Sequence, residues 1–156
     1  MFSKILIPLD GTPECESALA PAIELAKKFD SAVVLLSVTP GYGTILGATA
    51  AESFGSSGSV AAAAAVAEAG EEVAGAYLDG IRATQGTPAW ETVLAEGDSA
   101  DEIVHQAQTS GADLIVMATH ARGGLRRLFI GSVSEDVIRK CGIPVLVVHT
   151  LEEKDD

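Results

Sequence analysis

Short, unbroken apolar runs separated by helical patterns are the feature that most constrains this chain. The run from Ala32 to Val38 (AVVLLSV) is rich in β-branched residues and lacks the polar alternation of a half-exposed strand. Strands of this kind occur where both faces of a sheet are covered, as in parallel sheets with crossover helices. The chain is therefore predicted to be an α/β protein with a parallel sheet.

Five strands and four helices are expected in alternation. The strands are predicted at residues 5–9, 32–38, 91–97, 113–118 and 144–148, with the third more exposed than the others. One helix is expected to be capped by Thr12 and to continue through Leu19, Ile23 and Ala26, and the Ala-rich residues 60–82 are expected to form another. The remaining helices are predicted from capping boxes at Ser99 and Ser132, and the second of these is expected to bury Val133, Val137 and Ile138.

Alternating strands and helices imply right-handed crossovers and a doubly wound sheet with helices on both faces. With a strand order of 3-2-1-4-5, the reversal point lies between the first and fourth strands, and ligands of such sheets bind beyond the carboxyl ends of the strands there. The chain is interpreted as one domain, residues 1–150, with a mobile Gly- and Ser-rich loop at about 39–59 and an acidic tail at 151–156.

The formal charge of −12 disfavours binding to nucleic acid or to an anionic membrane, because such partners are gathered by Lys and Arg clusters. The N-terminal apolar run is too short for a signal peptide and no stretch would span a membrane, so a cytoplasmic location is expected. Cys15 and Cys141 are expected to be free thiols on opposite faces of the sheet.

The segment 117–134, MATHARGGLRRLFIGSVS, has the composition of an anion-binding loop. It follows a predicted strand, is rich in Gly and Arg, and ends at a helix N-terminus, whose free N–H groups and dipole favour phosphate. The alternative interpretation is that its glycines only make turns and its arginines solubilise a loop.

The chain resembles the universal stress protein family in its KILIPLDGT start, its GDSADEIV segment, the stretch ADLIVMATHARGGLRRLFIGSVSEDVI and its IPVLVV end. The resemblance implies an adenine nucleotide alpha hydrolase-like fold and a homodimer through the strand Val145–Val148. It also implies adenine nucleotide binding, with ATP the first candidate, accompanied by Mg or Mn. The glycine motif of nucleotide-binding members falls on Ala118, Ala121, Gly131 and Ser132, so alanine replaces the first two glycines.

By this resemblance, Asp10 would accept hydrogen bonds from adenine or ribose, and the remaining site residues would line the base, ribose and phosphates. These are Pro8, Leu9 and Val38 for the base, and Met117, Ala118, His120, Ala121, Arg122, Gly131, Ser132, Val133 and Ser134 for the ribose and phosphates.

Three functions remain open at this point. The first is a nucleotide-binding stress or signalling protein, with cyclic AMP as a variant ligand. The second is a ligand-free interaction protein in which Ala118 and Ala121 close the pocket. The third is an enzyme, but no catalytic residue or metal site is indicated, since a GxSxG elbow is missing and no histidine has a partner at ligand spacing, so any ATP hydrolysis is expected to be slow.

Overall fold

The computed structural model describes residues 1–41, 59–119 and 132–150, with the backbone alone for residues 59–63. Its centre is a five-stranded sheet in the order β3-β2-β1-β4-β5, in which every pairing is parallel. The strands are β1 (Lys4–Pro8), β2 (Ala32–Thr39), β3 (Glu91–Glu96), β4 (Leu114–Thr119) and β5 (Val145–His149). The predicted fold class and strand order are confirmed.

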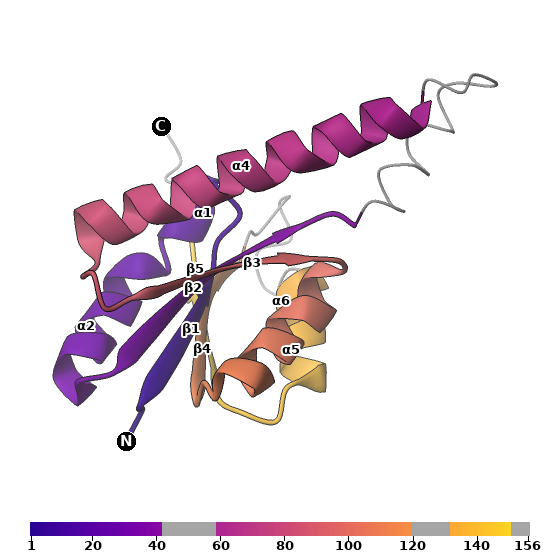
Figure 1. Cartoon of the computed structure of the whole chain (residues 1–156). Coiled ribbons are helices and arrows are strands. Elements are labelled where there is room, and N and C mark those ends of the chain that lie inside the picture. The colour runs from indigo at the N-terminus through magenta and orange to yellow at the C-terminus, as the bar shows by residue number, and fades with distance from the viewer. Residues whose placement is uncertain (42–58, 120–131, 151–156) are drawn as a thin grey trace, which may run out of the picture.

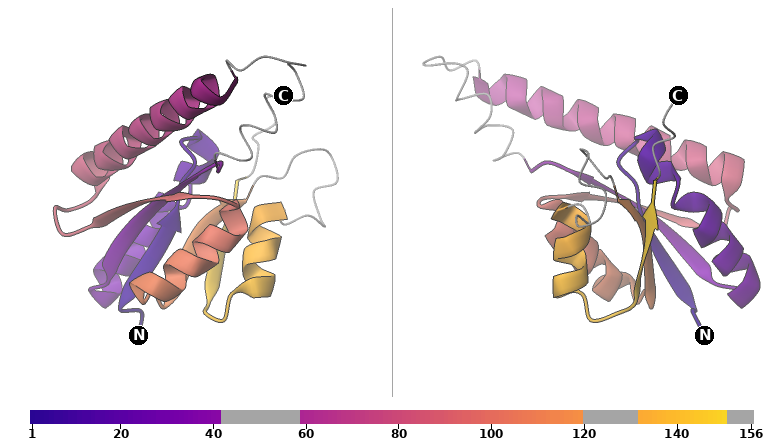
Figure 2. Two further views of the ribbon diagram at one scale, coloured as in Figure 1. Left: turned by 45° about the vertical axis from the view of Figure 1, so that its right-hand side comes forward. Right: turned by 180° about the vertical axis from the view of Figure 1, so that it is seen from behind.

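Helices cover both faces of this sheet (Figure 1). One layer contains α1 (Pro13–Glu16), α2 (Leu19–Phe29) and α4 (Ser59–Gln85), and the other contains α5 (Ser99–Ser110) and α6 (Ser132–Lys140). The two views of Figure 2 show α4 crossing one face and α5 lying beside α6 on the other.

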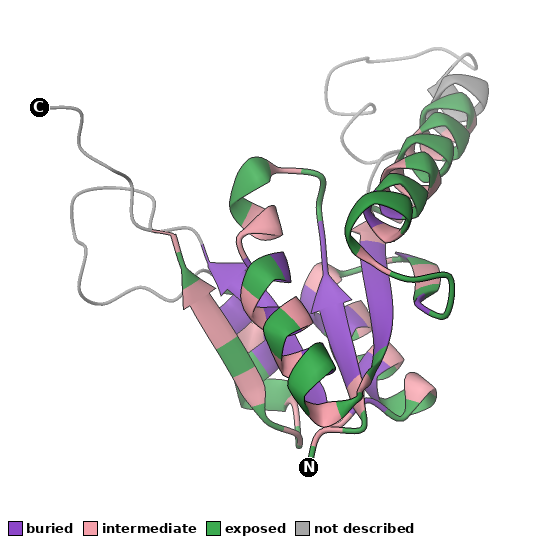
Figure 3. Ribbon diagram, turned by 90° about the vertical axis from the view of Figure 1, so that its left-hand side faces the viewer, coloured by how far each residue is buried: buried purple, intermediate pink, exposed green. Residues whose placement is uncertain are grey.

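Two hydrophobic clusters fill the space between the sheet and its helices. Odd-numbered β1 residues such as Ile5 and Ile7 pack with α2 and α4, whereas Leu6 packs with α5 and α6. The strands β1 and β4 are buried along almost their whole length, whereas both edge strands are partly exposed (Figure 3). Cys15 packs against the first cluster and Cys141 against the second, so the two thiols lie on opposite faces as predicted.

The helix expected after Thr12 is divided into two. Thr12 caps α1 as predicted, but α1 ends after four residues. Ser17 bonds to the carbonyl three residues before it, instead of the carbonyl four residues before it as in an α-helix. The Ser17 N–H donates to the Glu14 carbonyl at 3.1 Å and its hydroxyl donates to the same oxygen at 2.6 Å. Ser and Thr hydroxyls compete in this way with the helical ladder.

The capping box predicted at Ser99 is one residue out of place. The residue that caps α5 is Asp98, whose Oδ1 accepts the Asp101 N–H at 3.1 Å, and Ser99 is already helical. Ser132 is the first residue of α6, and the residue before it lies outside the described part of the chain, so the capping box predicted there stays a prediction. Of the three apolar residues expected to be buried on α6, Val137 is buried, but Val133 and Ile138 are exposed.

The segment predicted as a mobile loop begins and ends inside regular structure. Thr39 is the last residue of β2 and Ser59 the first of α4, while residues 42–58 lie outside the part of the chain that the structure describes. None of the helices described is long and apolar enough to cross a bilayer.

Candidate functional site

Asp10 lies two residues beyond the carboxyl end of β1, in a turn that fixes its side chain. The Thr12 N–H and hydroxyl both donate to Asp10 Oδ1, at 2.9 and 2.6 Å. Between them, Gly11 adopts φ of +83°, a conformation that favours glycine. The two bonds from Thr12 hold the carboxylate in one orientation. Because Asp10 is exposed, the carboxylate also remains accessible to a ligand.

The same turn is joined to the first helix. Thr12 Oγ1 accepts the Cys15 N–H at 3.3 Å as the cap of α1. Burial raises the pKa of the Cys15 thiol to about 11, and the hydrogen bond and negative charge of Asp10 act in the same direction. Cys15 is therefore a protonated thiol beside Asp10 and not a nucleophile.

A second contact ties α1 to α4. The Tyr77 hydroxyl donates to Glu16 Oε1 at 2.9 Å. Burial raises the pKa of Tyr77, and the hydrogen bond to the negative Glu16 raises it further, so Tyr77 stays a hydrogen-bond donor. The long helix α4 is thus fixed to the helix that follows the Asp10 turn.

The apolar residues predicted for the base and ribose lie near the ends of three neighbouring strands, but their side chains diverge. Leu9 and Ala118 point into the cluster beneath α1, α2 and α4, whereas Val38 and Met117 pack toward α5 and α6. Pro8 is buried at the end of β1. Because the Leu9 side chain is buried and its N–H donates to the Leu36 carbonyl at 2.8 Å, we expect Leu9 to contact a ligand through its carbonyl oxygen.

The methyl group of Ala118 belongs to the buried core. Ala118 is 7 % exposed and packs with the cluster that includes Leu9 and Val116. The alanine that the resemblance places at a glycine of the nucleotide-binding motif is therefore accommodated by the packing of the sheet. It follows that the Ala118 methyl group is a poor candidate for a group that blocks a ligand.

The N-terminus of α6 supplies the other predicted part of the site. Ser132 and Val133 are exposed in its first turn, and Ser134 is buried. The first N–H groups of a helix have no partner within it, so they can bind phosphate oxygens. Glu135 in the same turn is paired with Arg139 at 2.7 Å, which compensates part of its charge near this end of the helix.

Four predicted site residues fall outside the described part of the chain. These are His120, Ala121, Arg122 and Gly131. The structure nevertheless defines both ends of their segment, since it leaves the sheet after Thr119 in β4 and returns at Ser132 in α6. Because β4 pairs in parallel with β1, the segment starts beside the carboxyl end of β1, where Asp10 lies.

Within residues 1–41, 59–119 and 132–150, no group of three His, Cys, Asp or Glu residues is placed to hold a metal ion. The described groups can form hydrogen bonds with polar groups of a ligand. A carboxylate at Asp10 can accept hydroxyl or amino hydrogens, and helix N–H groups can donate to phosphate. Because Glu14 and Glu16 lie in the first turn of α1, phosphates would be favoured on the α6 side and not on the α1 side.

Sequence reasoning missed the contacts that hold the turn in place. The Asp10–Gly11–Thr12 spacing is typical of an Asx turn, so the Thr12 bond to Asp10 could have been predicted. The Tyr77–Glu16 bond joins residues 61 positions apart, and nothing local in the sequence indicates it.

Sequence comparison matches residues 1–149 to the universal stress protein family. One relative, universal stress protein MJ0531 of Methanocaldococcus jannaschii, is 34% identical over 153 residues, which cover 95% of this chain and 82% of the relative.

Structural comparison finds the same fold in solved structures of universal stress proteins. UspA from Lactobacillus plantarum aligns with a TM-score of 0.73 at 19% identity over 94% of this chain and 97% of its own. A universal stress protein in complex with cAMP aligns with a TM-score of 0.60 at 20% identity, covering 96% and 98% of the two chains. A universal stress protein from Archaeoglobus fulgidus in complex with dAMP gives 0.59 at 22% identity, covering 93% and 96%. At these identities the likeness establishes the fold.

Proposed function

This chain belongs to the universal stress protein family, and from that premise we propose that it binds an adenine nucleotide at the carboxyl ends of β1 and β4. ATP is the first candidate, and cyclic AMP is the second. The protein would act in a stress response or in signalling, with the bound nucleotide changing its conformation or partners.

The observation that carries this proposal is the fixed carboxylate of Asp10 at the reversal point of the sheet. Asp10 Oδ1 is oriented by two bonds from Thr12 at the end of β1, next to the strand from which the Gly- and Arg-rich segment departs. Ligands of doubly wound sheets bind at this place. The complexes of family members with cAMP and dAMP support an adenine nucleotide as the ligand class.

Electrostatics favour one orientation of the nucleotide. Asp10 is followed by Glu14 and Glu16, so the uncharged adenine and ribose fit the α1 side. The phosphates would lie toward the first turn of α6 and the arginines that precede it in the sequence, including Arg122. A metal ion such as Mg²⁺ would accompany the phosphates, because Mg²⁺ is usually bound through substrate phosphates together with few protein ligands.

We also propose that two copies pair through β5. This strand lies at the edge of the sheet, and Leu146 on it is 38% exposed. An apolar edge strand presents unpaired N–H and carbonyl groups, and pairing with a second copy would cover them.

The first experiment is to denature protein purified without added ligand and to identify any released nucleotide by mass and absorbance. The second is calorimetric titration of ATP, ADP, AMP and cyclic AMP, with Mg²⁺, into wild type, Asp10→Ala and Gly131→Val. We expect each variant to lose at least about tenfold in affinity. Asp10→Ala removes hydrogen bonds to a charged group, which contribute about 1.5–3 kcal/mol, and Gly131→Val would block the approach of the backbone to the phosphates. If no nucleotide produces heat with wild type, the alternative of a ligand-free interaction protein is favoured.

A further inference from the structure

Helix α1 depends on its neighbours for its position. It has four residues, Pro13–Glu16, and none of them is buried. A single helical turn is marginal in water, because few hydrogen bonds offset the ordering of its backbone, and most helices are stabilised by packing of an apolar face. The position of α1, and of the Asp10 turn that precedes it, is therefore set by contacts with other elements.

Helix α4, which lies above α1 in Figure 1, supplies one of these contacts. The Tyr77 hydroxyl donates to Glu16 Oε1 at 2.9 Å, and both residues are half-buried. Tyr77 precedes Leu78, which is completely buried, and Ile81 one turn further along α4 is buried as well. The donor is thus fixed by the part of α4 that packs on the core, so it can hold Glu16 in place.

Further hydrogen bonds lead from Glu16 to the candidate site. The Cys15 N–H donates to Thr12 Oγ1 at 3.3 Å, and the Glu16 N–H donates to the Thr12 carbonyl oxygen at 3.3 Å. Thr12 in turn donates from its N–H and its hydroxyl to Asp10 Oδ1. A continuous series of hydrogen-bonded residues therefore connects Tyr77 on α4 with Asp10.

The charges that act on Tyr77 agree with this connection. Burial raises the pKa of the Tyr77 hydroxyl, the bond to the negative Glu16 raises it further, and the negative charge of Asp10 acts in the same direction. The hydroxyl therefore remains protonated at neutral pH and continues to donate to Glu16. Asp10 is also close enough to Tyr77 for its charge to be felt there.

We propose that Tyr77 is a positioning residue for the nucleotide site, because its bond to Glu16 holds α1 and thereby keeps the Asp10 carboxylate ordered through Thr12. The inference rests on the proposed nucleotide binding and adds that α4, which carries none of the predicted site residues, contributes to the affinity. A ligand binds more weakly when binding must also order the groups it contacts. Since coupling between two sites is reciprocal, a bound nucleotide would stabilise the contact between α1 and α4.

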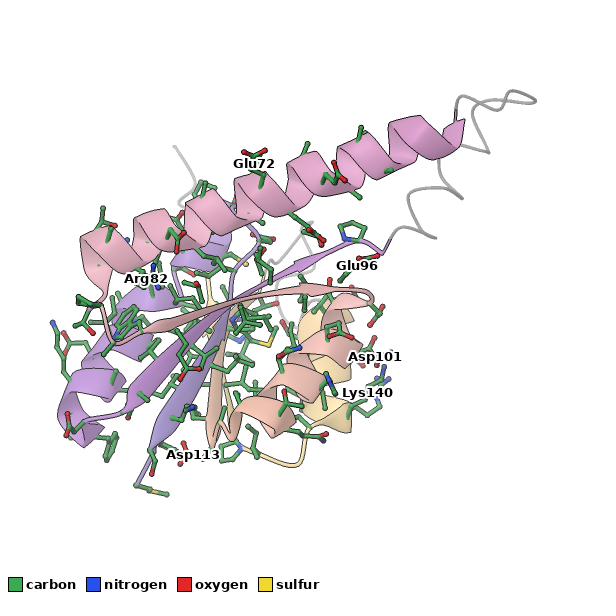
Figure 4. All side chains as sticks on the ribbon, in the orientation of Figure 1. Glu72, Arg82, Glu96, Asp101, Asp113 and Lys140 are labelled. Atoms are coloured by element: carbon green, nitrogen blue, oxygen red, sulfur yellow. The ribbon has the colours of Figure 1, made fainter. Side chains whose placement is uncertain are left out.

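Tyr77→Phe is the first variant, because it keeps the ring that packs against the core and removes the hydroxyl. Calorimetric titration of ATP with Mg²⁺, and of cyclic AMP, should give an affinity about threefold to tenfold lower than that of wild type. Asp113→Asn is the control for a general loss of stability, because it weakens bonds to the Ser3 and Lys4 N–H groups. Figure 4 shows Asp113 at the end of the sheet opposite α1, so its variant should bind as wild type does.

Two substitutions of Glu16 separate its hydrogen bond from its charge. Glu16→Gln and Glu16→Ala both remove the negative charge, but glutamine keeps a side-chain carbonyl oxygen that can accept the Tyr77 bond. Adding Tyr77→Phe should therefore lower the affinity about threefold in the Glu16→Gln protein and leave it unchanged in the Glu16→Ala protein. Equal effects in the two backgrounds would mean that Tyr77 does not act through Glu16, and the proposal would be overturned.

Hydrogen exchange measured by NMR without nucleotide tests the turn itself. The amide hydrogens of Cys15 and Glu16 should exchange about threefold faster or more in Tyr77→Phe than in wild type, because the bonds that protect them depend on the position of α1. In Asp113→Asn they should exchange as in wild type. A Tyr77→Phe protein with unchanged exchange, or with reduced stability and unchanged nucleotide affinity, would refute the positioning role.

The Tyr77 ring reports the reciprocal effect. The chain has two tyrosines, so the ring-carbon NMR signal of Tyr77 is identified by its absence from Tyr77→Phe. This signal should shift as nucleotide saturates wild type, and a signal that stays in place at saturation would contradict the coupling. If wild type binds neither ATP nor cyclic AMP, the proposed function fails, whereas the exchange of Cys15 and Glu16 still decides whether Tyr77 holds the turn.

Discussion

Replacing Thr12 by valine tests how the candidate site is held in place. The substitution keeps the shape of the side chain but removes its hydroxyl, which donates to Asp10 Oδ1 at 2.6 Å and accepts the Cys15 N–H at 3.3 Å. The bond from the Thr12 N–H to Asp10, at 2.9 Å, is retained. Asp10 would therefore keep one of the two bonds from Thr12 that orient it.

The expected loss can be estimated from these two bonds. Loss of a helix N-cap costs about 1 kcal/mol, and an exposed hydrogen bond to a carboxylate contributes up to about 1 kcal/mol. We therefore expect Thr12→Val to lower the free energy of unfolding in urea by about 1–2 kcal/mol. Nucleotide affinity should fall by about threefold to tenfold, because Asp10 must be ordered when the ligand binds.

A double-mutant cycle separates these two effects. If Thr12 acts on the ligand through Asp10, Thr12→Val should change the affinity little when Asp10 is already alanine. Thr12→Ser retains the hydroxyl and should resemble wild type in both stability and affinity. The reasoning is refuted if Thr12→Val lowers affinity equally with and without Asp10, or lowers stability and leaves affinity unchanged.

Three further predictions follow from other parts of the fold. Hydrogen bonds from the Ser3 and Lys4 N–H groups outweigh partial desolvation and lower the pKa of Asp113, so its carboxylate stabilises the fold above its unfolded pKa. Asp113→Asn should lower the unfolding free energy by about 1 kcal/mol at neutral pH, and the difference should vanish in urea titrations as the pH falls from about 4 to about 2. Cys15, with its pKa raised to about 11, should react with iodoacetamide at pH 8 about a hundredfold more slowly in folded than in unfolded Cys141→Ser protein, and equal rates by mass spectrometry would contradict its protonated state. Val147→Lys on β5 should yield monomer or insoluble protein, and light scattering that finds a dimer as in wild type would place the interface elsewhere.

The sheet could be predicted from the sequence because its signals are local and strong. The run from Ala32 to Val38 has the composition of a strand buried on both sides, and the observed β2 is one residue longer. Errors arose where neighbours in space decide the outcome. Val133 and Ile138 have the helical spacing of buried residues, but α6 packs on β4 and α5 along a line that includes Ser134 and Val137.

The candidate site was predictable only in part. Because Asp10 follows an apolar strand and precedes a helix cap, the sequence predicted its place beyond the carboxyl end of β1, whereas its role in binding came from the family resemblance and stays a prediction. The side-chain directions of Leu9 and Ala118 depend on the pleat and register of the sheet. A shift of the register by one residue would turn each side chain to the opposite face. The bond between Tyr77 and Glu16 depends on where two helices meet on the sheet, and helix periodicity alone does not contain that information.

The location of the nucleotide is the central claim, and backbone amide NMR tests it most directly. During titration with ATP and Mg²⁺, the amide signals of Gly11 and Thr12 beyond β1 and of Val133 in the first turn of α6 should shift together. The amide signals of Ser3 and Lys4, which lie beside Asp113 at the amino ends of the strands, should not shift. Saturable shifts at Ser3 and Lys4 with none at Gly11, Thr12 or Val133 would contradict the site proposed for this protein.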